Sequence, residues 1–305
     1  MTTPRVWLGP DEDPAPLFGD AIREGGGQLS AIDDANAIVW LGSDPSELED
    51  TLNPDIEWVQ LHAAGVSTYV AAGLVTGSPI FTSAAGAFSD AVAEHGLGLA
   101  IAGLRELHQY ARAQQWKPSE DMHTLRGASV AVVGAGGIGK ALIDLLHPFG
   151  VEVIAVNRSG EPVDGADRVV STDGLERVWG DADVIVLAVP ETEETRHMVG
   201  RDQLTAMRSH AVLVNVGRGT LIETEALVDA LAQDEIGCAA VDVTDPEPLP
   251  GGHPLWSEPR CLLTPHVANF RQARAPALAR RIRENVTRFA VDEPLVAVVD
   301  PERGY

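Results

Sequence analysis

Basic residues are scarce in this chain of 305 residues. It has 22 Lys and Arg against 45 Asp and Glu, which gives a formal net charge of −23 at pH 7. Proteins that bind nucleic acid carry a basic patch that neutralises phosphates, and no basic stripe occurs here. The composition therefore argues against a nucleic-acid partner. Any anionic ligand needs a local site built from a few arginines and backbone amides.

Long apolar runs are also missing. A helix that spans a bilayer needs about 20 consecutive apolar residues, and no run in the sequence approaches that length. The opening stretch MTTPRVWLGPDEDP lacks the basic and apolar regions of a signal peptide. We therefore expect a cytoplasmic protein with no membrane partner.

Cysteine is nearly absent, with Cys238 and Cys261 alone. Both lie in apolar, strand-like runs, which predicts buried free thiols. Neither has the spacing of a metal site, so no metal is expected. With 45% hydrophobic residues, the chain is typical of a globular protein long enough for two domains.

Short apolar runs and helical patterns alternate through the first and last parts of the chain. Strands are predicted at residues 6–8, 37–41, 58–61 and 80–82, each bounded by Gly, Pro, Asp or Asn. The pattern predicts one long helix from Phe88 to about Arg112. The tail is predicted to form a helix over residues 271–288 and then a strand over 295–299.

The middle of the chain has the most regular pattern. It contains the nearly continuous apolar runs SVAVVGAGGIG, VEVIAVN, ADVIVLAVP, HAVLVNVG, CAAVDV and CLLTP. Runs without polar alternation indicate strands buried on both faces, as in a parallel sheet covered by helices. We predict an α/β fold in which a doubly wound parallel sheet (Rossmann) domain, residues 96–270, is inserted in a smaller flavodoxin-like α/β domain. Residues 1–95 plus 271–305 form that smaller, substrate-binding domain.

A glycine-rich pattern lies between the first of these runs and a helix. Gly134, Gly136 and Gly139 form G-x-G-x-x-G in VVGAGGIGKAL, and only this strand-to-helix context makes the pattern informative. The glycines permit a tight turn and close backbone approach, so that a pyrophosphate lies at the helix N-terminus. The sequence predicts a dinucleotide site that also includes Gly137 and Ile138. The alternative is a glycine-rich turn without a ligand.

The end of the next strand distinguishes the two nicotinamide dinucleotides. An acidic residue there binds the ribose 2′-hydroxyl and repels a 2′-phosphate. This sequence has Asn157, Arg158 and Ser159 instead, with no carboxylate before Glu161. A guanidinium beside a hydroxyl suits a 2′-phosphate, so we favour NADP(H) over NAD(H). The alternative is an Arg158 that faces solvent and binds nothing.

Seven segments, in their order and spacing, resemble the D-2-hydroxyacid dehydrogenase family over nearly the whole chain. They are AAGVSTY, AEHGLGLAIAGLREL, VVGAGGIG, LAVPETEETRHMV, VNVGRGTLIE, AAVDVTDPEPLP and LLTPHVAN. The stretch WVQLHAAGVSTY looks most like the glyoxylate/hydroxypyruvate reductase branch. The resemblance implies an NAD(P)-dependent oxidoreductase that acts on a small anionic 2-keto or 2-hydroxy acid. It also implies a homodimer packed through the nucleotide domain.

Three positions match the catalytic residues of the family. Arg218 matches the substrate-binding arginine, His266 matches the catalytic histidine, and Glu247 matches the acid that partners this histidine. The resemblance implies that His266 gives a proton to the developing alkoxide. A carboxylate at Glu247 favours the imidazolium and orients its ring, and Arg218 binds the substrate carboxylate and polarises the keto oxygen.

The resemblance also assigns binding residues. Ala64, Gly65 and Val66 match a loop whose backbone amides hold the substrate carboxylate, although Ser67 stands where an aspartate is frequent. Asp242 matches an aspartate near the nicotinamide. The remaining residues expected at the cofactor are Val189, Pro190, Thr195, Val216, Gly217, His266 and Asn269.

Simpler interpretations stay open beside these. His266 could be a structural histidine, Arg218 a surface arginine in a salt bridge, and Glu247 a solvated loop charge. His95 and His108 are interpreted as structural. The alternative functions are an NAD-dependent D-2-hydroxyacid dehydrogenase, a phosphite-type dehydrogenase, and an NAD(P)H-sensing binding protein like the corepressors that share this fold.

Overall fold

The computed structural model describes residues 3–10, 16–116, 118 and 121–301. The chain divides into two compact units, Met1–Phe88 with Phe270–Tyr305, and Ser89–Asn269. The expected boundary after residue 95 falls inside helix α4 (Ser89–Leu104). The observed boundary lies at the start of α4, because its apolar residues from Val92 to Leu104 pack in a core of the second unit.

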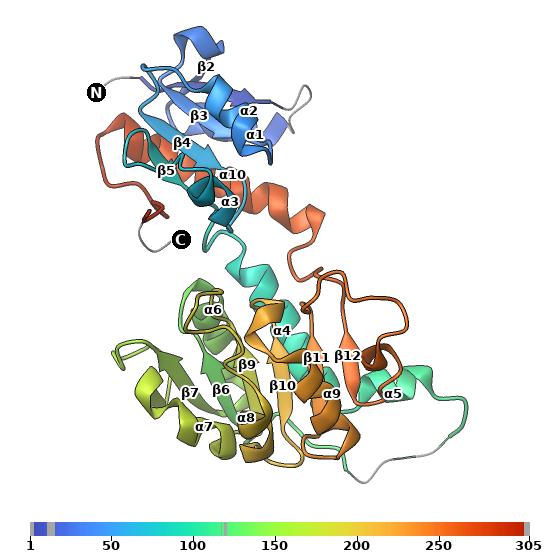
Figure 1. Ribbon diagram of the computed structural model, residues 1–305. Helices are drawn as coiled ribbons and strands as arrows, with labels where there is room; N and C mark the ends of the chain where they lie inside the picture. Colours follow the sequence, from blue (N-terminus) through green and yellow to red (C-terminus); the bar gives the residue numbers. More distant parts are fainter. Residues whose placement is uncertain (1–2, 11–15, 117, 119–120, 302–305) are drawn as a thin grey trace. The chain divides into compact units, whose positions relative to one another are not determined.

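The smaller unit is built on a parallel five-stranded sheet in the order β2-β1-β3-β4-β5 (Figure 1). Its strands are β1 (Arg5–Gly9), β2 (Gln28–Leu29), β3 (Ala37–Trp40), β4 (Trp58–Leu61) and β5 (Ile80–Thr82). This is the strand order of flavodoxin-like sheets. After β1 the chain places β2 at one edge of the sheet and then adds β3, β4 and β5 toward the other edge.

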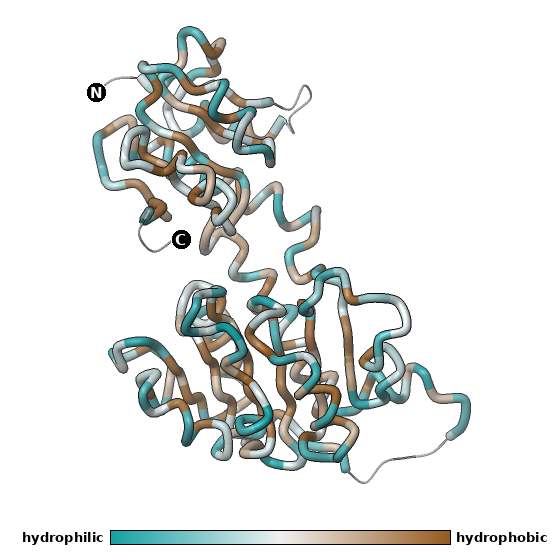
Figure 2. The backbone as a smooth tube through the Cα atoms, viewed as in Figure 1, coloured by the Kyte–Doolittle hydropathy of each residue, from teal (hydrophilic) through white to brown (hydrophobic). Residues whose placement is uncertain are grey.

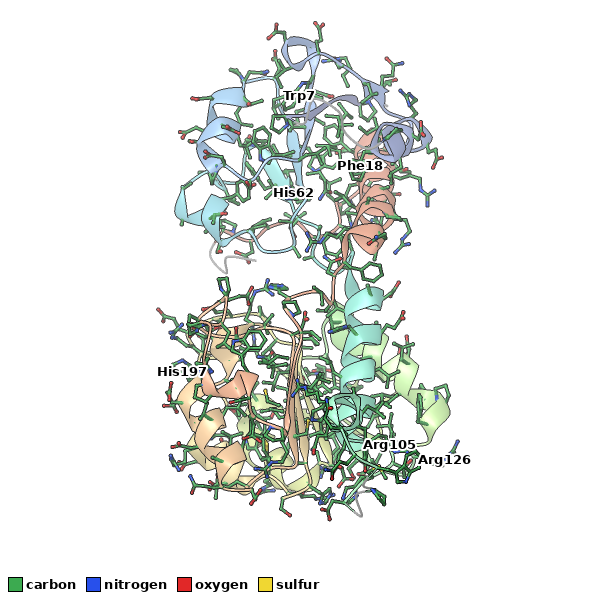
Figure 3. The ribbon with its side chains drawn as sticks, turned by 90° about the vertical axis from the view of Figure 1, so that its right-hand side faces the viewer. Trp7, Phe18, His62, Arg105, Arg126 and His197 are labelled. Atoms are coloured by element: carbon green, nitrogen blue, oxygen red, sulfur yellow. The ribbon has the colours of Figure 1, made fainter. Side chains whose placement is uncertain are left out.

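Helices cover both faces of this sheet. They are α1 (Pro16–Glu24), α2 (Pro45–Thr51), α3 (Ser67–Ala71) and α10 (Arg271–Ala290). Successive side chains of a strand point to opposite faces, so Val39 packs with α1 and α10 whereas Trp40 packs with α2 and α3. Phe18 of α1 and Ile282 of α10 both belong to the first of these cores, and Figure 3 shows Phe18 beside α10. Strands buried on both faces explain why β3 and β4 read as continuous apolar runs.

Two expectations about secondary structure, one in each unit, are wrong. Residues 295–299 form one antiparallel bridge, Thr82 to Val298, and no strand, because Ala297 has a φ of 59° that turns the chain. The helix predicted from Phe88 to Arg112 is two helices, α4 and α5 (Leu107–Arg112). They are separated at Glu106, whose φ of 49° is incompatible with a continuous right-handed helix.

The larger unit contains a parallel sheet in the order β12-β11-β10-β9-β6-β7-β8. Its strands are β6 (Ser129–Val133), β7 (Glu152–Asn157), β8 (Arg168–Ser171), β9 (Val184–Leu187), β10 (Val212–Asn215), β11 (Cys238–Val241) and β12 (Cys261–Leu263). The winding direction reverses between β6 and β9, which confirms the predicted doubly wound sheet. Apolar residues are concentrated in its strands (Figure 2).

Two helical layers enclose this sheet. Helices α4 and α6 (Gly137–Leu146) pack on one face, and α7 (Leu175–Asp181), α8 (Arg201–Ala206) and α9 (Thr224–Ala232) pack on the other. Short 3-10 helices occupy Ile32–Asp34, His147–Phe149, Thr172–Gly174, Gly219–Leu221 and Pro254–Trp256.

Cys238 and Cys261 are buried and free, as predicted. Burial raises the pKa of Cys261 to about 12. Within the described part of the chain, every helix is too short or too polar to cross a membrane.

Candidate active site

The predicted site residues of the larger unit follow the carboxyl ends of its strands. Because all strands of this sheet are parallel, these ends lie at one edge, where open α/β sheets bind ligands. Gly134 follows β6, Val189 follows β9, and Val216 follows β10. Asp242 follows β11, and the segment with His266 follows β12.

The glycine-rich turn fits a phosphate. Gly134 has a φ of 104°, and a Cβ on Gly139 would overlap the Gly134 carbonyl, so both positions require glycine. Gly136 is the N-cap of α6, and no side-chain hydrogen bond caps this end of the helix. A Cβ on Gly136 would meet nothing within 4 Å. Gly136 and Gly137 are also exposed, so this end of α6 is accessible to an anion.

The turn after β7 is ordered by the side chain of Asn157. Its Oδ1 accepts the Gly160 N–H at 2.6 Å, and its Nδ2 donates to the Glu161 carbonyl at 2.8 Å. Arg158 and Ser159 are exposed. The pKa of Glu194 is below its ordinary value, mainly because of a side-chain hydrogen bond with Thr192. The positive charge of Arg158 also lowers this pKa. Arg158 therefore lies close to the loop that follows β9.

The loops after β9 and β10 contact one another. The Thr195 hydroxyl donates to the Pro190 carbonyl at 2.8 Å and so closes the first loop. A Cβ on Gly217 would lie 2.9 Å from the Val189 carbonyl, so glycine is needed for this contact. Val189, Pro190, Thr195 and Gly217 are thereby brought into one region, as their assignment to one cofactor requires.

Arg218 has a fixed backbone and an exposed side chain. Asn215 is fully buried at the end of β10, where its Nδ2 donates to the Arg218 carbonyl at 2.8 Å and its Oδ1 accepts the Gly217 N–H at 3.0 Å. The Arg218 Nη1 donates to the Gly217 carbonyl at 2.8 Å. A Cβ on Gly219 would overlap the Thr244 carbonyl, so this segment lies directly against the loop after β11.

His266 and Glu247 are paired. The His266 Nδ1 and the Glu247 Oε1 are 2.6 Å apart, and the two side chains are 46% and 43% exposed. An ionised carboxylate only accepts hydrogen bonds, so Nδ1 carries a hydrogen and the ring orientation is fixed. The Nε2 atom is then the ring position from which a proton can be transferred.

Asp242, at the end of β11, is buried and binds the loop that carries His266. Its side chain is 1% exposed. Burial by itself raises the pKa of this carboxyl, but hydrogen bonds from His95, Thr264 and two backbone amides outweigh it and keep the pKa below its ordinary value. Sequence reasoning missed Thr264 and interpreted His95 as structural. A hydroxyl directly after the apolar run Leu262–Leu263 was the available signal for Thr264.

The predicted substrate loop lies in the smaller unit. Ala64 and Gly65 are exposed, whereas Val66 is 2% exposed and packs in the core with Tyr69. The Ala63 carbonyl accepts the Ala84 N–H at 2.9 Å, which fixes the start of the loop. The backbone of Ala64 and Gly65 is accessible to a ligand. Ser67, at the departure from the family pattern, begins α3.

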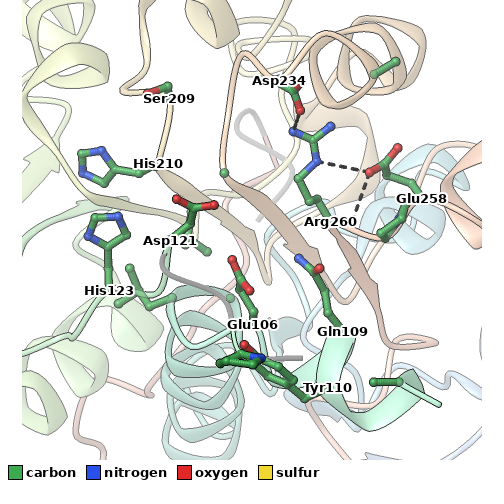
Figure 4. Close-up of a pocket in the computed structure, with 18 of the residues that line it drawn as sticks. Glu106, Gln109, Tyr110, Asp121, His123, Ser209, His210, Asp234, Glu258 and Arg260 are labelled. Atoms are coloured by element: carbon green, nitrogen blue, oxygen red, sulfur yellow. Dashed lines mark hydrogen bonds and ion pairs between the residues drawn. The ribbon is translucent and has the colours of Figure 1, made fainter. Parts of the chain in front are cut away.

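A separate cavity of about 1020 Å³ lies in the larger unit, at the amino ends of the sheet strands, where Val212 begins β10. Polar side chains line it, including His123, His210 and Arg260 (Figure 4). The two histidine rings stack with centroids 4.5 Å apart. No predicted catalytic residue lines this cavity. Among the described residues, no cluster of His, Cys, Asp or Glu could hold a metal ion.

The sequence model of a known family matches more than half of the chain. Its description is D-isomer specific 2-hydroxyacid dehydrogenase, NAD binding domain, and the match covers residues 97–268. The chain belongs to the D-isomer specific 2-hydroxyacid dehydrogenases. This dehydrogenase is therefore an NAD(P)-dependent oxidoreductase, and the predicted family and fold are confirmed.

The chain is also similar to individual proteins. The dehydrogenase is 41% identical to a Corynebacterium melassecola protein named for its position in the proB 3′ region, over 93% of this chain and 95% of that one. It is 31% identical to a glyoxylate reductase of Thermofilum pendens, over 83% of this chain and 79% of the other. Its fold is similar to a D-isomer specific 2-hydroxyacid dehydrogenase from Xanthobacter autotrophicus Py2, solved with NADPH and MES. That comparison has a TM-score of 0.84 at 24% identity and covers 100% of both chains.

Proposed function

We propose that this dehydrogenase reduces a small 2-keto acid such as glyoxylate or hydroxypyruvate, and that it uses NADPH in preference to NADH. The observation that carries the proposal is the pairing of His266 with Glu247 at the sheet edge that also bears Arg218 and the glycine-rich turn. The 31% identity to the Thermofilum pendens glyoxylate reductase supports the choice of substrate.

The dinucleotide is held along the carboxyl edge of the larger sheet. The uncapped end of α6 takes its pyrophosphate, and the Arg158 guanidinium with the Ser159 hydroxyl takes the 2′-phosphate. When bound, the nicotinamide supplies the hydride that reduces the keto carbon. The residues proposed to hold the dinucleotide are Gly134, Gly136, Gly137, Ile138, Gly139, Asn157, Arg158, Ser159, Val189, Pro190, Thr195, Val216, Gly217, Asp242, His266 and Asn269.

The proton for the keto oxygen comes from His266. In reduction the Nε2–H bond breaks, and the proton joins the oxygen as the carbonyl becomes an alcohol. Glu247 holds Nδ1 at 2.6 Å and stabilises the charged ring before the transfer. In oxidation the neutral Nε2 takes the proton back. Arg218 binds the substrate carboxylate, and its guanidinium polarises the keto oxygen as charge develops.

Initial rates with glyoxylate and hydroxypyruvate, each measured with NADPH and with NADH, test this function. We expect turnover of at least one keto acid and a higher kcat/KM for NADPH. Failure to reduce any acid of a broad 2-keto acid panel with either cofactor would falsify it. Oxidation of phosphite would then identify a phosphite-type enzyme. A partner protein captured only with NAD(P)H, without turnover, would identify a sensor.

The cofactor preference depends on Arg158. Hydrogen bonds to charged groups contribute about 1.5–3 kcal/mol, so Arg158→Ala is expected to lower kcat/KM for NADPH about 10- to 100-fold. The kcat/KM for NADH should stay within about two-fold, because NADH has no 2′-phosphate for the guanidinium to bind. Steady-state kinetics with both cofactors measure the two values.

Arg201→Ala is the matched control for Arg158→Ala. Arg201 is an exposed arginine of the same unit, and its Nη2 pairs with Asp229 at 2.5 Å. The control should leave both cofactors unaffected. An equal loss for NADPH and NADH in Arg158→Ala, or an NADH preference of the unaltered enzyme, would refute the phosphate contact.

We also propose that the enzyme is a cytoplasmic homodimer. Exposed apolar side chains gather around α5 of the larger unit, where Leu107 is 51%, Trp116 100% and Met122 38% exposed. Exposed apolar groups of this kind mark protein contact surfaces. Light scattering coupled to size exclusion, on the full chain, measures the mass in solution.

A further inference from the structure

A chain of hydrogen bonds connects helix α4 to the loop that bears His266. The His95 Nε2 on α4 lies 3.0 Å from the Thr264 hydroxyl oxygen, which lies 2.5 Å from the Asp242 Oδ1. The His95 Nε2 is also 3.4 Å from the same carboxylate oxygen. Three elements of the larger unit therefore meet at one buried carboxylate, namely α4, the end of β11 and the end of β12.

The hydrogens in this chain follow from the chemistry of each group. A threonine hydroxyl has one hydrogen, and an ionised carboxylate has none to donate. The Thr264 hydroxyl must therefore donate to Asp242, and its oxygen is left to accept from His95. The Nε2 atom of His95 consequently carries a hydrogen. The direction of the chain is fixed, from His95 through Thr264 to Asp242.

Asp242 in turn holds the backbone on both sides of His266. Its Oδ1 accepts the Val267 N–H at 2.9 Å, and its Oδ2 accepts the Ala268 N–H at 3.0 Å. Its main-chain carbonyl accepts the His266 N–H at 2.7 Å. His266 itself has a φ of 53°, which a residue other than glycine keeps only when its surroundings hold it. The backbone conformation at His266, from which its ring projects, is thus held largely by Asp242.

We propose that His95 and Thr264 are positioning residues, which act through Asp242 to hold His266 in the orientation needed for proton transfer. The proposal rests on the proposed function of His266 as the acid–base group. Neither residue touches the reacting atoms. Thr264 keeps one oxygen of Asp242 in place, and His95 keeps the Thr264 hydroxyl directed at that oxygen.

Kinetics of Thr264 variants test the positioning role. A catalytic group displaced by about 1 Å loses about 10²-fold in rate. Since Asp242 keeps its two amide donors, Thr264→Val should lower kcat about ten-fold and change KM for the keto acid by no more than about two-fold. Thr264→Ser retains the hydroxyl and should restore kcat to within about two-fold. His95→Leu should lower kcat as much as Thr264→Val does. His95→Gln retains an N–H the same number of bonds from the backbone, so its loss of kcat should be smaller.

Two comparisons separate positioning from general destabilisation. Thr205→Val removes a hydroxyl that also donates to a carboxylate, Glu235 Oε2 at 3.3 Å, on the surface of the same unit. This control should retain full activity. The double variant His95→Leu/Thr264→Val should lose no more than Thr264→Val alone, because both act through one chain. Full additivity of the two losses, or no rescue by serine, would overturn the proposal.

Hydrogen–deuterium exchange gives a readout that needs no turnover. The amides of Val267 and Ala268 should exchange at least ten-fold faster in Thr264→Val and His95→Leu than in the unaltered enzyme, and at the original rate in Thr264→Ser. Unchanged exchange in the first two variants would overturn the positioning role. If the unaltered enzyme reduces no keto acid, the proposed function fails, and exchange alone then decides whether the chain of bonds holds the loop.

Discussion

Replacing His266 with glutamine is expected to lower kcat for keto-acid reduction by about 10²- to 10⁴-fold, the usual contribution of general acid–base catalysis. Glutamine preserves a hydrogen-bond donor of similar reach but does not release a proton near neutral pH. The hydride step then has no partner that neutralises the developing alkoxide. Consumption of NADPH at saturating glyoxylate or hydroxypyruvate measures the loss.

The stability of the His266→Gln variant should change little. The His266 side chain is 46% exposed, and exposed ion pairs contribute only about 0–1 kcal/mol. His197→Gln is the matched control, since His197 is also exposed and has a φ of 51°. It should retain the original kcat. More than a tenth of the original activity in His266→Gln would contradict an acid–base role.

The placement of Arg218 and His266 at the carboxyl ends of the larger sheet's strands could be predicted because its signal is local. Buried parallel strands are continuous apolar runs, and their carboxyl ends share one edge. Arg218 and His266 each follow such a run directly, so the sequence alone was enough to bring them to one region. The pairing of Glu247 with His266 came from the family resemblance, and the distance of 2.6 Å between Oε1 and Nδ1 agrees with it.

The features that sequence reasoning missed depend on contacts between distant segments or on backbone angles. His95 and Thr264 are 169 residues apart, so no local pattern indicates their hydrogen bond. The break between α4 and α5 is due to the left-handed φ of Glu106, a residue type that ordinarily favours helix continuation. Strand β8, the outermost strand of the sheet, has only the residues Arg168–Ser171, and most of them are half-buried. This run is too short and too polar to be recognised as a strand from the sequence.

Arg218→Lys is expected to lower kcat/KM for the keto acid about 10²- to 10³-fold, in the range found for the loss of one donor to a developing oxyanion. Lysine keeps the positive charge but not the planar fork that binds a carboxylate with two parallel hydrogen bonds. Both KM and kcat should change, since the guanidinium acts on the substrate carboxylate and on the keto oxygen. Steady-state kinetics with glyoxylate and NADPH give the two constants.

The effect of Arg218→Lys on kinetics should come only from the contacts of the side chain at residue 218. Asn215 and Gly217 fix the backbone there through hydrogen bonds that the substitution leaves intact. The melting temperature and the Kd for NADPH should therefore equal those of the original enzyme. A carbonyl compound of similar size without a carboxylate provides the decisive comparison. Arg218→Lys should reduce its already low turnover much less than that of glyoxylate, because the carboxylate contact is absent from the start. Equal fold losses for the two substrates would show that Arg218 acts on the keto oxygen alone.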